Sequence, residues 1–420
     1  MTTNILENID MRQLGKLLQQ ARKQRGMTQE EAGTLIESSR TTMVAIEKGD
    51  RRLKPGELIK LARAYGKSVS DFVRPRSFVE PFDTQFRAMY RLNKEEEQEI
   101  KPYVLQLEEL CQNYLELEQI MKSPLPRKYP PEYNVSGMPV EVTAEAIANQ
   151  ERQRLGLGDS PIGMLRDTLE ISVGLRIFYL PMPVKYSEIY SYNEKLGGCI
   201  SVNAYHREER QRWSLAHGYL HFLAHRYKSV FDFENLKEQY ERMPESEQLA
   251  EAFSKYFLMP TSSLLKQFNE RCQVNQDSKF TPTDLFTLAH YYGVSVMAMT
   301  LRLEEMKLLP SGTWNKLKIR GLKVKETQNN LNLADKLPSR SDLNPVHYQH
   351  LAIEALDQGL ITEGQFAFFL GVNRLESRRI AELLREYSSE MDEQEGNLDL
   401  RQNQNDKWEI YANQSLSSSH

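Results

Sequence analysis

The chain has 420 residues, of which 40% are hydrophobic and 27% are charged. This composition excludes wholesale disorder, and the length predicts two or three folded domains. No apolar run reaches ~18 residues and the N-terminus has no basic and then apolar start, so we expect neither a membrane-spanning helix nor a secretory signal. Three widely separated cysteines exclude a disulfide framework and a four-cysteine zinc module, and they predict a cytoplasmic protein.

The N-terminal region, residues 10–77, is a run of short amphipathic helical patterns. Residues 1–77 hold 15 lysines and arginines against nine acidic residues, a net charge of +6, which leaves −10 for the rest of the chain. Thr28 precedes one helical pattern and Glu31 follows three residues later, which is the signature of a capping box. A second short helix is predicted between Ser39 and Gly49. Two such helices with a tight break between them have the layout of a helix-turn-helix, and the positive charge suits a polyanion.

In this layout the second helix lies in the major groove of DNA. Arg40 can pair with guanine, and the methyl group of Thr41 can contact thymine. The loop after Gly49 places cations where phosphate contacts are needed. The predicted DNA-binding residues are Gln29, Ser39, Arg40, Thr41, Val44, Ala45, Lys48, Arg51 and Arg52.

The segment resembles the phage-repressor family of helix-turn-helix domains (Cro/C1 or XRE type), from the TQEE start to the IEKG end. The resemblance implies that a homodimer binds a palindromic operator in double-stranded DNA. The sequence departs from the family at Ala32, where leucine is usual, at Glu37, where glycine is usual, and at Ser38, where an apolar residue is usual. The alternative interpretation is a plain helical bundle with a basic face.

Residues 78–137 are predicted to form a helical linker. Residues 93–122 are charged and rich in leucine, which predicts a long helix with an interruption near Pro102. Four prolines within 123–137 mark its end. We expect a second domain over 138–265, a helical C-terminal region over 266–386, and a disordered acidic and polar tail over 387–420.

The second domain mixes helical and strand patterns. Residues 171–181 and 197–203 are rich in Val, Ile, Leu and Tyr, which predicts two strands. Residues 208–227 and 245–258 predict helices. The pattern is typical of an α+β domain with a small sheet.

The helix over 208–227 carries a pair of metal-ligand residue types. His217 and His221 are four residues apart, so both imidazoles point the same way and can share one zinc ion. In the catalytic pattern H-E-x-x-H the glutamate is the general base for a zinc-bound water, but Gly218 stands at that position here. Two histidines leave zinc short of ligands, and the next helix offers Glu247 and Glu251.

These segments resemble the ImmA/IrrE family of metallo-endopeptidases. The resemblance implies a zincin-like α+β fold, zinc held by His217, His221 and Glu247, and fusion to XRE domains. It also implies cleavage or inactivation of repressors in mobile elements and stress responses. The matching phrases are GGCISVN over 197–203, RQRWSLAH over 210–217 followed by His221, and E-x-x-A-x-x-F from Glu247 followed by Leu258-Met259-Pro260.

The missing glutamate changes what this domain is expected to do. Loss of a general base costs about 10²–10⁴ in rate. We therefore interpret the protein as a sequence-specific DNA-binding transcriptional regulator whose zincin-like domain is catalytically impaired and serves sensing or protein interaction. His217 and His221 then hold zinc in a structural or sensor role, remain metal-free in the core, or support slow hydrolysis. The alternative is an active zinc metallo-endopeptidase that cleaves a repressor. A further possibility is that the protein binds a repressor, a toxin or a phage protein without cleaving it.

The C-terminal region contains one further pattern. Residues 362–373 have a spacing like that of a helix-turn-helix, although a packing or dimerisation module is the preferred interpretation. The complete prediction is a multidomain α and α+β protein with a five-helix helix-turn-helix domain, a long helical linker, a zincin-like domain with a small sheet, and a helical C-terminal region.

Overall fold

The chain, in a computed structural model, divides into two compact units, Met1–Thr84 and Gln85–His420. Each unit is described by itself. The predicted tail over 387–420 and nearly all of residues 74–93 lie outside the described residues. The structure describes residues 10–67, 69–73, 82, 94–228, 230–233, 244–274, 279–333 and 343–386.

Within residues 10–73 the structure has the five helices that the sequence predicted. The side chain of Asp10 accepts hydrogen bonds from two backbone N–H groups at the start of the first helix. Thr28 and Glu31 form the predicted capping box at the start of the second. Leucine, isoleucine and alanine side chains from these helices make one small core. The helices are α1 (Met11–Gln24), α2 (Gln29–Leu35), α3 (Arg40–Lys48), α4 (Pro55–Tyr65) and α5 (Ser70–Val73).

Helix α3 is fixed to α1 and α2 through one buried carboxylate, that of Glu47. Nε of Arg22 donates to Oε1 of Glu47 at 2.5 Å, and Nε2 of Gln29 donates to Oε2 at 2.8 Å. Burial raises the pKa of Glu47, but the hydrogen bonds from Arg22 and Gln29 outweigh it, so the pKa lies below its ordinary value. The orientation of α3 therefore depends on this ionised side chain.

The second unit is built on a four-stranded sheet in the order β1-β3-β2-β4. Strand β3 pairs parallel to β1 and antiparallel to β2, and β2 pairs antiparallel to β4. The predicted small sheet is confirmed, but β2 was not predicted. All its residues are buried, including Ser187, Glu188 and Ser191, so the strand has no apolar run or alternation to reveal it. The strands are β1 (Arg176–Leu180), β2 (Tyr186–Asn193), β3 (Gly197–Asn203) and β4 (Val230–Phe233).

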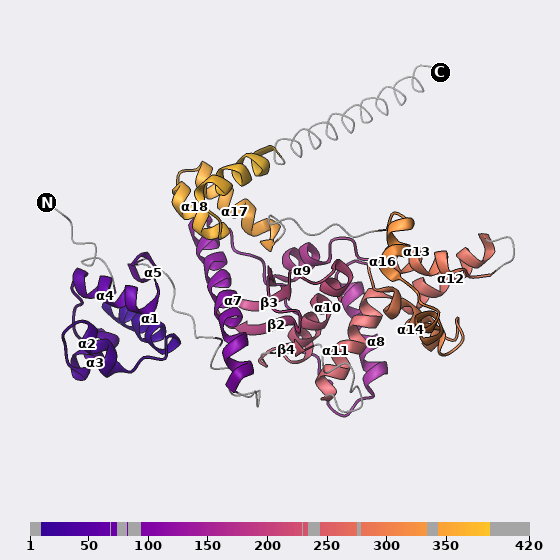
Figure 1. Ribbon diagram of the computed structural model, residues 1–420, viewed down its shortest axis with the longest axis horizontal. Coiled ribbons are helices and arrows are strands. Elements are labelled where there is room, and N and C mark those ends of the chain that lie inside the picture. Colours follow the sequence, from indigo (N-terminus) through magenta and orange to yellow (C-terminus); the bar gives the residue numbers. More distant parts are fainter. Residues whose placement is uncertain are drawn as a thin grey trace, which may run out of the picture. The chain divides into compact units, whose positions relative to one another are not determined.

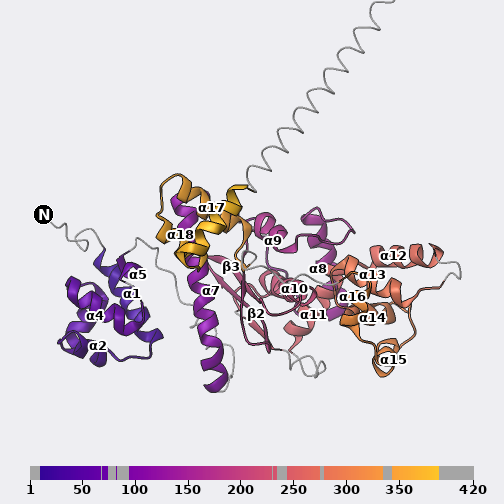
Figure 2. The same ribbon diagram turned by 45° about the horizontal axis from the view of Figure 1, so that its top comes forward.

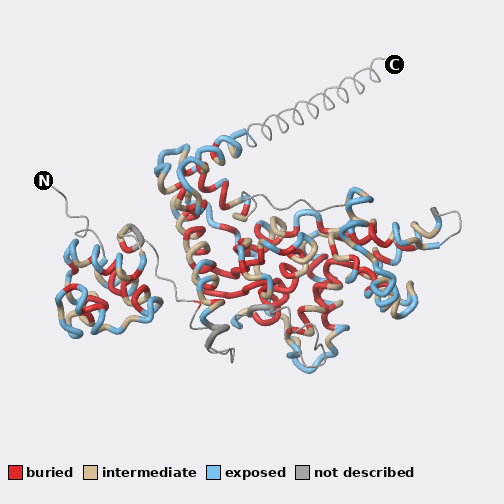
Figure 3. Tube along the Cα trace, viewed as in Figure 1, coloured by how far each residue is buried: buried red, intermediate tan, exposed pale blue. Residues whose placement is uncertain are grey.

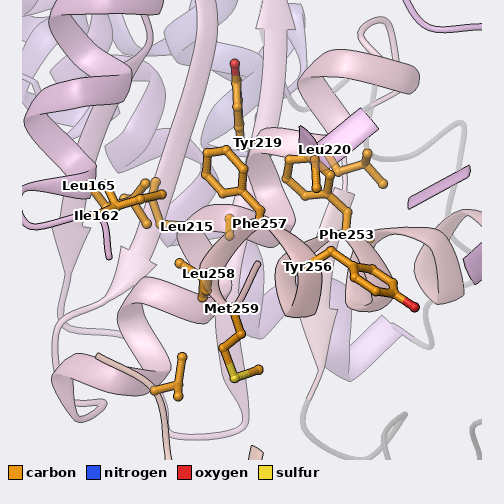
Figure 4. Close-up of a cluster of buried hydrophobic side chains, with 14 of the residues drawn as sticks. Ile162, Leu165, Leu215, Tyr219, Leu220, Phe253, Tyr256, Phe257, Leu258 and Met259 are labelled. Carbon is orange, nitrogen blue, oxygen red and sulfur yellow. The ribbon is translucent and has the colours of Figure 1, made fainter. Parts of the chain in front are cut away.

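Helix α10 (Glu208–Ala224) is the central helix of this unit. It packs against β2 and β3 and against α11 (Glu245–Leu258), which packs against α8 (Val140–Arg154). Every residue of α10 from Ser214 to Ala224 is buried, as the red tube in Figure 3 shows. Aromatic rings fill the space between α10 and α11, as in the ring pair of Tyr219 and Phe253 (Figure 4). A helix enclosed in this way presents its polar side chains to a dry interior.

Helix α7 (Lys94–Met121) lies on the other face of the sheet and packs against β1 and β3 (Figure 1). Its described inward face includes Val104, Leu107 and Tyr114. The predicted interruption near Pro102 is wrong, because the helix continues through this residue. Pro102 is exposed, so water can bond the carbonyl group that the proline leaves without a donor.

The three helices predicted over 346–386 are present, and the first of them packs against α7 (Figures 1 and 2). They are α17 (Val346–Asp357), α18 (Glu363–Leu370) and a helix over 374–386. The hydroxyl of Tyr114 on α7 donates to Oε1 of Glu170 at 2.6 Å and lies 2.8 Å from Nδ1 of His347 on α17. Because Tyr114 and Tyr348 also pack ring against ring, α17 is held by both polar and aromatic contacts.

The remaining helices extend the main core of the second unit. Leu285, Phe286, Met299 and Leu303 belong to the same buried cluster as α8, α10 and α11. In the part of the chain that the structure describes, no helix is both long and apolar enough to span a membrane. These helices are α9 (Leu165–Val173), α12 (Thr261–Val274), α13 (Pro282–Tyr292), α14 (Val296–Glu305), α15 (Thr313–Ile319) and α16 (Val324–Asn330).

Candidate metal centre and nucleic-acid interface

Helix α10 presents His217 and His221 side by side in the interior of the second unit. One helical turn separates them, and their ring centroids are 4.9 Å apart. Both side chains are buried, with at most 1% of their surface exposed. The spacing of four therefore places two imidazoles together in a site that is dry enough for strong metal coordination.

Glu247 on α11 reaches both imidazoles. Its Oε2 lies 3.4 Å from Nε2 of His217, and its Oε1 lies 3.6 Å from Nε2 of His221. Tetrahedral zinc with bonds of about 2.0–2.1 Å separates its ligand atoms by about 3.3 Å, close to these two distances. The structure thus brings the three predicted ligands together, and their binding of zinc stays a prediction.

Two buried atoms of this cluster support the fit to a metal ion. Among the described residues, Nε2 of His217 and Oε2 of Glu247 have no hydrogen-bond partner beyond their own 3.4 Å contact. Buried polar atoms of this kind need an explanation, and a bound ion is one that matches a donor set of two nitrogens and a carboxylate. When bound there, zinc supplies Lewis acidity to the oxygen of a water or carbonyl group.

Glu188 on β2 belongs to the same cluster, although the sequence analysis missed it. Its Oε1 lies 2.8 Å from Nδ1 of His217, a hydrogen-bond contact, and Glu188, His217 and His221 form a group able to hold a metal. Because Nδ1 is taken by Glu188, His217 turns Nε2 toward Glu247. We therefore assign Glu188 to orienting His217, a role that carboxylates commonly play beside metal-binding histidines.

Gly218 lets the carboxylate of Glu188 lie where it does. A Cβ atom at position 218 would meet Oε1 of Glu188 at 3.3 Å and the side chain of Ile200 at 3.4 Å. The space beside position 218 is thus taken by a carboxylate that comes from the sheet. The sequence signal for Glu188 is a single acidic residue within the strand YSEIYSYN. It could have been recognised only if this strand had been predicted.

The electric field of the two carboxylates acts on the histidines. Burial lowers the pKa of His217, but the charges of Glu188 and Glu247 outweigh burial and raise it well above its ordinary value. Burial raises the pKa of Glu247, but His221 and His217 bring it below its ordinary value. The two negative charges therefore favour positive charge between them, carried either by a proton on His217 or by a metal ion that replaces this proton.

One further glutamate of α11, Glu251, was considered as the third ligand. Its Oε2 accepts a hydrogen bond from Nε1 of Trp213 at 2.8 Å. Glu247 instead occupies the position facing both histidines. The geometry thus separates the two candidate ligands and favours Glu247.

A hollow of about 580 Å³ opens beside the histidine cluster. Residues 132–136 contribute to its lining, together with Ala224, His225, Ser246 and Leu249. The ring of His225 contacts that of His221 with centroids 5.4 Å apart. Burial, followed by the charge of His221, lowers the pKa of His225 to about 4. The lining of the hollow thus includes an imidazole that contacts one of the candidate metal ligands.

In the N-terminal unit, α3 presents most of the predicted DNA-binding residues on its outer side. Ser39, Arg40, Thr41 and Lys48 are exposed, and Val44 and Ala45 are half-buried. Ser39 caps α3, since its Oγ accepts from the backbone N–H of Thr42 at 3.2 Å. The helix therefore begins with small polar and cationic side chains, at the end that helix-turn-helix domains in general present to the major groove.

The other three predicted DNA-binding residues differ in their surroundings. Arg52 is exposed. Arg51 forms a bidentate ion pair with Glu57, at 2.8 and 3.1 Å. The amide of Gln29 donates to Glu47 within the unit. Arg40 and Arg52 thus offer more open cationic groups than Arg51 does.

Comparisons with known proteins agree with this division. Residues 18–72 match the helix-turn-helix family model, and residues 172–304 match the model of the IrrE N-terminal-like domain. The chain therefore carries a helix-turn-helix domain, which is a DNA-binding module, and an IrrE-like domain, as the sequence predicted. No curated protein matches the chain. The crystal structure of ComR from Streptococcus suis matches over 91% of each chain at 11% identity. The TM-score of this match is 0.15.

Proposed function

We propose that the protein is a transcriptional regulator that binds an operator through α3 and uses its IrrE-like domain for sensing or protein interaction rather than for proteolysis. The observation that carries the proposal is the exposed start of α3, with Ser39, Arg40 and Thr41 next to each other on a helix-turn-helix frame. These side chains offer a guanine reader and a thymine contact. Lys48 and Arg52 add cations for phosphates.

A homodimer would present two copies of α3 to a palindromic operator. Its half-sites would then be separated by one turn of DNA, ~34 Å, or a multiple of it. The small interface of a single helix-turn-helix gives modest affinity, so pairing of two copies increases specificity. We therefore propose a homodimer whose partner is double-stranded DNA.

In the IrrE-like domain, His217, His221 and Glu247 would hold zinc. The proposal of impaired catalysis rests on the carboxylates that the described residues place around them. Position 218 has no side chain, Glu247 faces both Nε2 atoms, and Glu188 is engaged with Nδ1 of His217. A general base must be within hydrogen-bond reach of the attacking water, and these contacts leave neither Glu188 nor Glu247 in that role.

Sensing or partner binding would use the hollow that is lined in part by His225. Its volume of about 580 Å³ lies in the range of ligand pockets in proteins. A small molecule or a segment of a repressor, toxin or phage protein bound there would contact the imidazole next to the zinc ligands. Binding would in this way be connected to the metal centre.

One observation favours the alternative, an active zinc endopeptidase that cleaves a repressor. Oε1 of Glu188 lies only 3.3 Å from the place where a Cβ at position 218 would be. A carboxylate is thus present near the position of the missing one. In this alternative Glu188 takes the proton of the attacking water and gives up its contact with His217.

DNA binding is tested by titrating the protein with its own promoter and with unrelated duplex DNA. Arg40→Ala should lower affinity for the promoter by about 10-fold. Arg63→Ala is the matched control, because Arg63 is also exposed but lies on α4. Equal affinity for both duplexes, or equal loss in both variants, would refute operator recognition.

The metal centre is tested by zinc content per chain and by cleavage assays on candidate repressors. His217→Ala should remove the zinc while the wild-type chain retains it and cleaves nothing. Cleavage that disappears in both His217→Ala and Glu188→Gln would instead establish the endopeptidase. A folded wild-type chain purified without zinc, even after incubation with the metal, would refute the metal site.

A further inference from the structure

Helix α18 and the helix over 374–386 share with α2 and α3 the same sequence of capping box, left-handed turn residue and capped second helix. Both pairs begin at a threonine that forms a capping box, Thr28 with Glu31 and Thr362 with Gln365. In each case the third residue after the threonine returns a side-chain hydrogen bond to its backbone N–H, at 2.7 and 2.8 Å. The two helices thus start in the same way.

The turns also correspond residue by residue. Nine residues after each threonine, the backbone enters the left-handed region, at Glu37 with φ 55° and at Gly371 with φ 67°. Two residues later, a polar side chain caps the next helix. Oγ of Ser39 accepts from the backbone N–H of Thr42 at 3.2 Å, and Oδ1 of Asn373 accepts from that of Glu376 at 2.9 Å. Glycine at position 371 makes this turn less strained than its N-terminal counterpart.

The buried positions of the two frames are equivalent as well. Ala32 and Phe366, four residues after the threonines, are at most 1% exposed. Met43 and Ser377, fifteen residues after them, are also at most 1% exposed. The second helix of each pair therefore turns the same side inward, and its opposite side faces out.

The outward side of the helix over 374–386 is rich in arginine. Arg374, Leu375, Arg378 and Arg379 are exposed. They stand at the positions that Arg40, Thr41, Val44 and Ala45 occupy in the N-terminal frame, so three arginines replace one. Arg378 pairs with Glu363 at 2.9 Å, but both partners are more than half exposed, so a phosphate can displace the carboxylate.

We propose that α18 and the helix over 374–386 form a second helix-turn-helix that contacts double-stranded DNA. Arginine is the side chain that pairs best with guanine and with phosphate, and exposed Leu375 can contact a thymine methyl group. Glu382 stands at the position of Lys48, which limits the DNA contact to the first two turns of this helix. The proposal uses no residue of the N-terminal unit and goes beyond the operator binding assigned to α3.

The test uses the full chain with its N-terminal surface disabled by Arg40→Glu and Arg52→Glu. The probe is a fluorescent duplex of mixed sequence, about three helical turns long, at ~50 mM salt. Anisotropy should report residual binding in this background. Adding Arg374→Glu and Arg379→Glu should weaken that binding about 10-fold or more.

The matched control adds Lys316→Glu and Lys318→Glu, which change the same charge at exposed positions of α15. This control should stay within about threefold of the background, since exposed charges far from the DNA are screened. An equal loss in the control would mean general attraction and would overturn the proposal.

Two further outcomes are distinguished by added measurements. If DNA binding is unchanged but sedimentation shows altered self-association, the arginine face contacts protein and the proposal is overturned. If circular dichroism shows a loss of helix in the glutamate variant, Arg374→Gln and Arg379→Gln remove the charges without repulsion. A folded glutamine variant that binds as tightly as the background overturns the proposal, whereas a 10-fold loss supports it. Failure of α3 to read an operator would leave this result untouched.

Discussion

Glu188 on β2 and His217 on α10 meet through Oε1 and Nδ1 at 2.8 Å, and both side chains are fully enclosed. The contact fixes which nitrogen of His217 faces Glu247. It also fills the space beside Gly218, where the H-E-x-x-H pattern would place a different glutamate. A carboxylate from the sheet and a glycine on the helix therefore form a complementary pair.

Glu188→Gln should weaken zinc binding by about 10- to 100-fold, because an amide holds His217 less firmly than a carboxylate does. Competition with a chromogenic chelator measures the affinity. Glu194→Gln is the control, since Glu194 is exposed in the turn after β2. Unchanged affinity in Glu188→Gln would contradict the orienting role of Glu188.

Gly218→Glu should destabilise the second unit by about 3 kcal/mol or more, because its carboxylate would be buried against that of Glu188. Denaturant unfolding followed by tryptophan fluorescence reports this unit, since all three tryptophans lie beyond residue 84. Gly218→Ala separates the steric part and should cost less. The double variant with Glu188→Gln should recover part of the loss, and wild-type stability in Gly218→Glu would count against the argument.

Glu47→Gln should destabilise the N-terminal unit by about 3 kcal/mol, because it leaves Arg22 buried without its counterion. DNA binding would then be lost through unfolding rather than through loss of a contact. Resistance of residues 10–73 to a protease, measured beside DNA affinity, separates the two causes. Lys48→Ala, at the exposed neighbouring position, should weaken DNA binding and leave protease resistance unchanged.

Glu170→Gln should change how stability depends on pH. Burial raises the pKa of Glu170 to about 7, even though the hydroxyl of Tyr114 donates to it. Between the unfolded-state pKa of about 4.5 and pH 7, the folded protein thus binds more protons than the unfolded chain. The stabilising contribution is complete below this range and is lost as the pH rises through 7, with a decrease of roughly 3 kcal/mol in the free energy of unfolding.

The measurement is urea unfolding of wild type and Glu170→Gln from pH ~4.5 to 8. The variant cannot ionise, so its profile should lack this decrease. His347, on the other side of Tyr114, has a pKa lowered by burial, so its own contribution has the opposite sign and is lost as the pH falls. Parallel profiles for the two proteins would show that Glu170 does not titrate in this range.

Much of the helical architecture was predictable because capping signals are local. Thr28 and Glu31 mark the start of a helix and Gly49 marks the end of one. The structure has α2 beginning after Thr28 and α3 ending before Gly49. The spacing of His217 and His221 likewise predicted that they face the same way. A contact such as His217 with Glu247 was reached only through family resemblance, since no local pattern encodes it.

The features that the sequence did not predict are set by how distant segments pack around them. Strand β2 contains polar residues that are fully enclosed, so its sequence lacks the pattern of a strand with one wet face. Glu188 was missed with it. The interruption expected at Pro102 is absent, because the helix is held by its opposite face. An exposed proline there costs the helix little stability. Such features follow from tertiary packing rather than from local sequence.

The contact of Tyr114 with His347 has a consequence for synthesis on the ribosome. The two residues are 233 positions apart, so at ~5–20 residues per second α7 emerges roughly 10–50 s before α17 can cover it. During this interval the tyrosine and its apolar neighbours on α7 have no final partner. The helix-turn-helix domain lies within Met1–Thr84, which is a compact unit, and it can be complete by then. A nascent chain would thus acquire its helix-turn-helix domain before the unit that carries the candidate metal centre has closed.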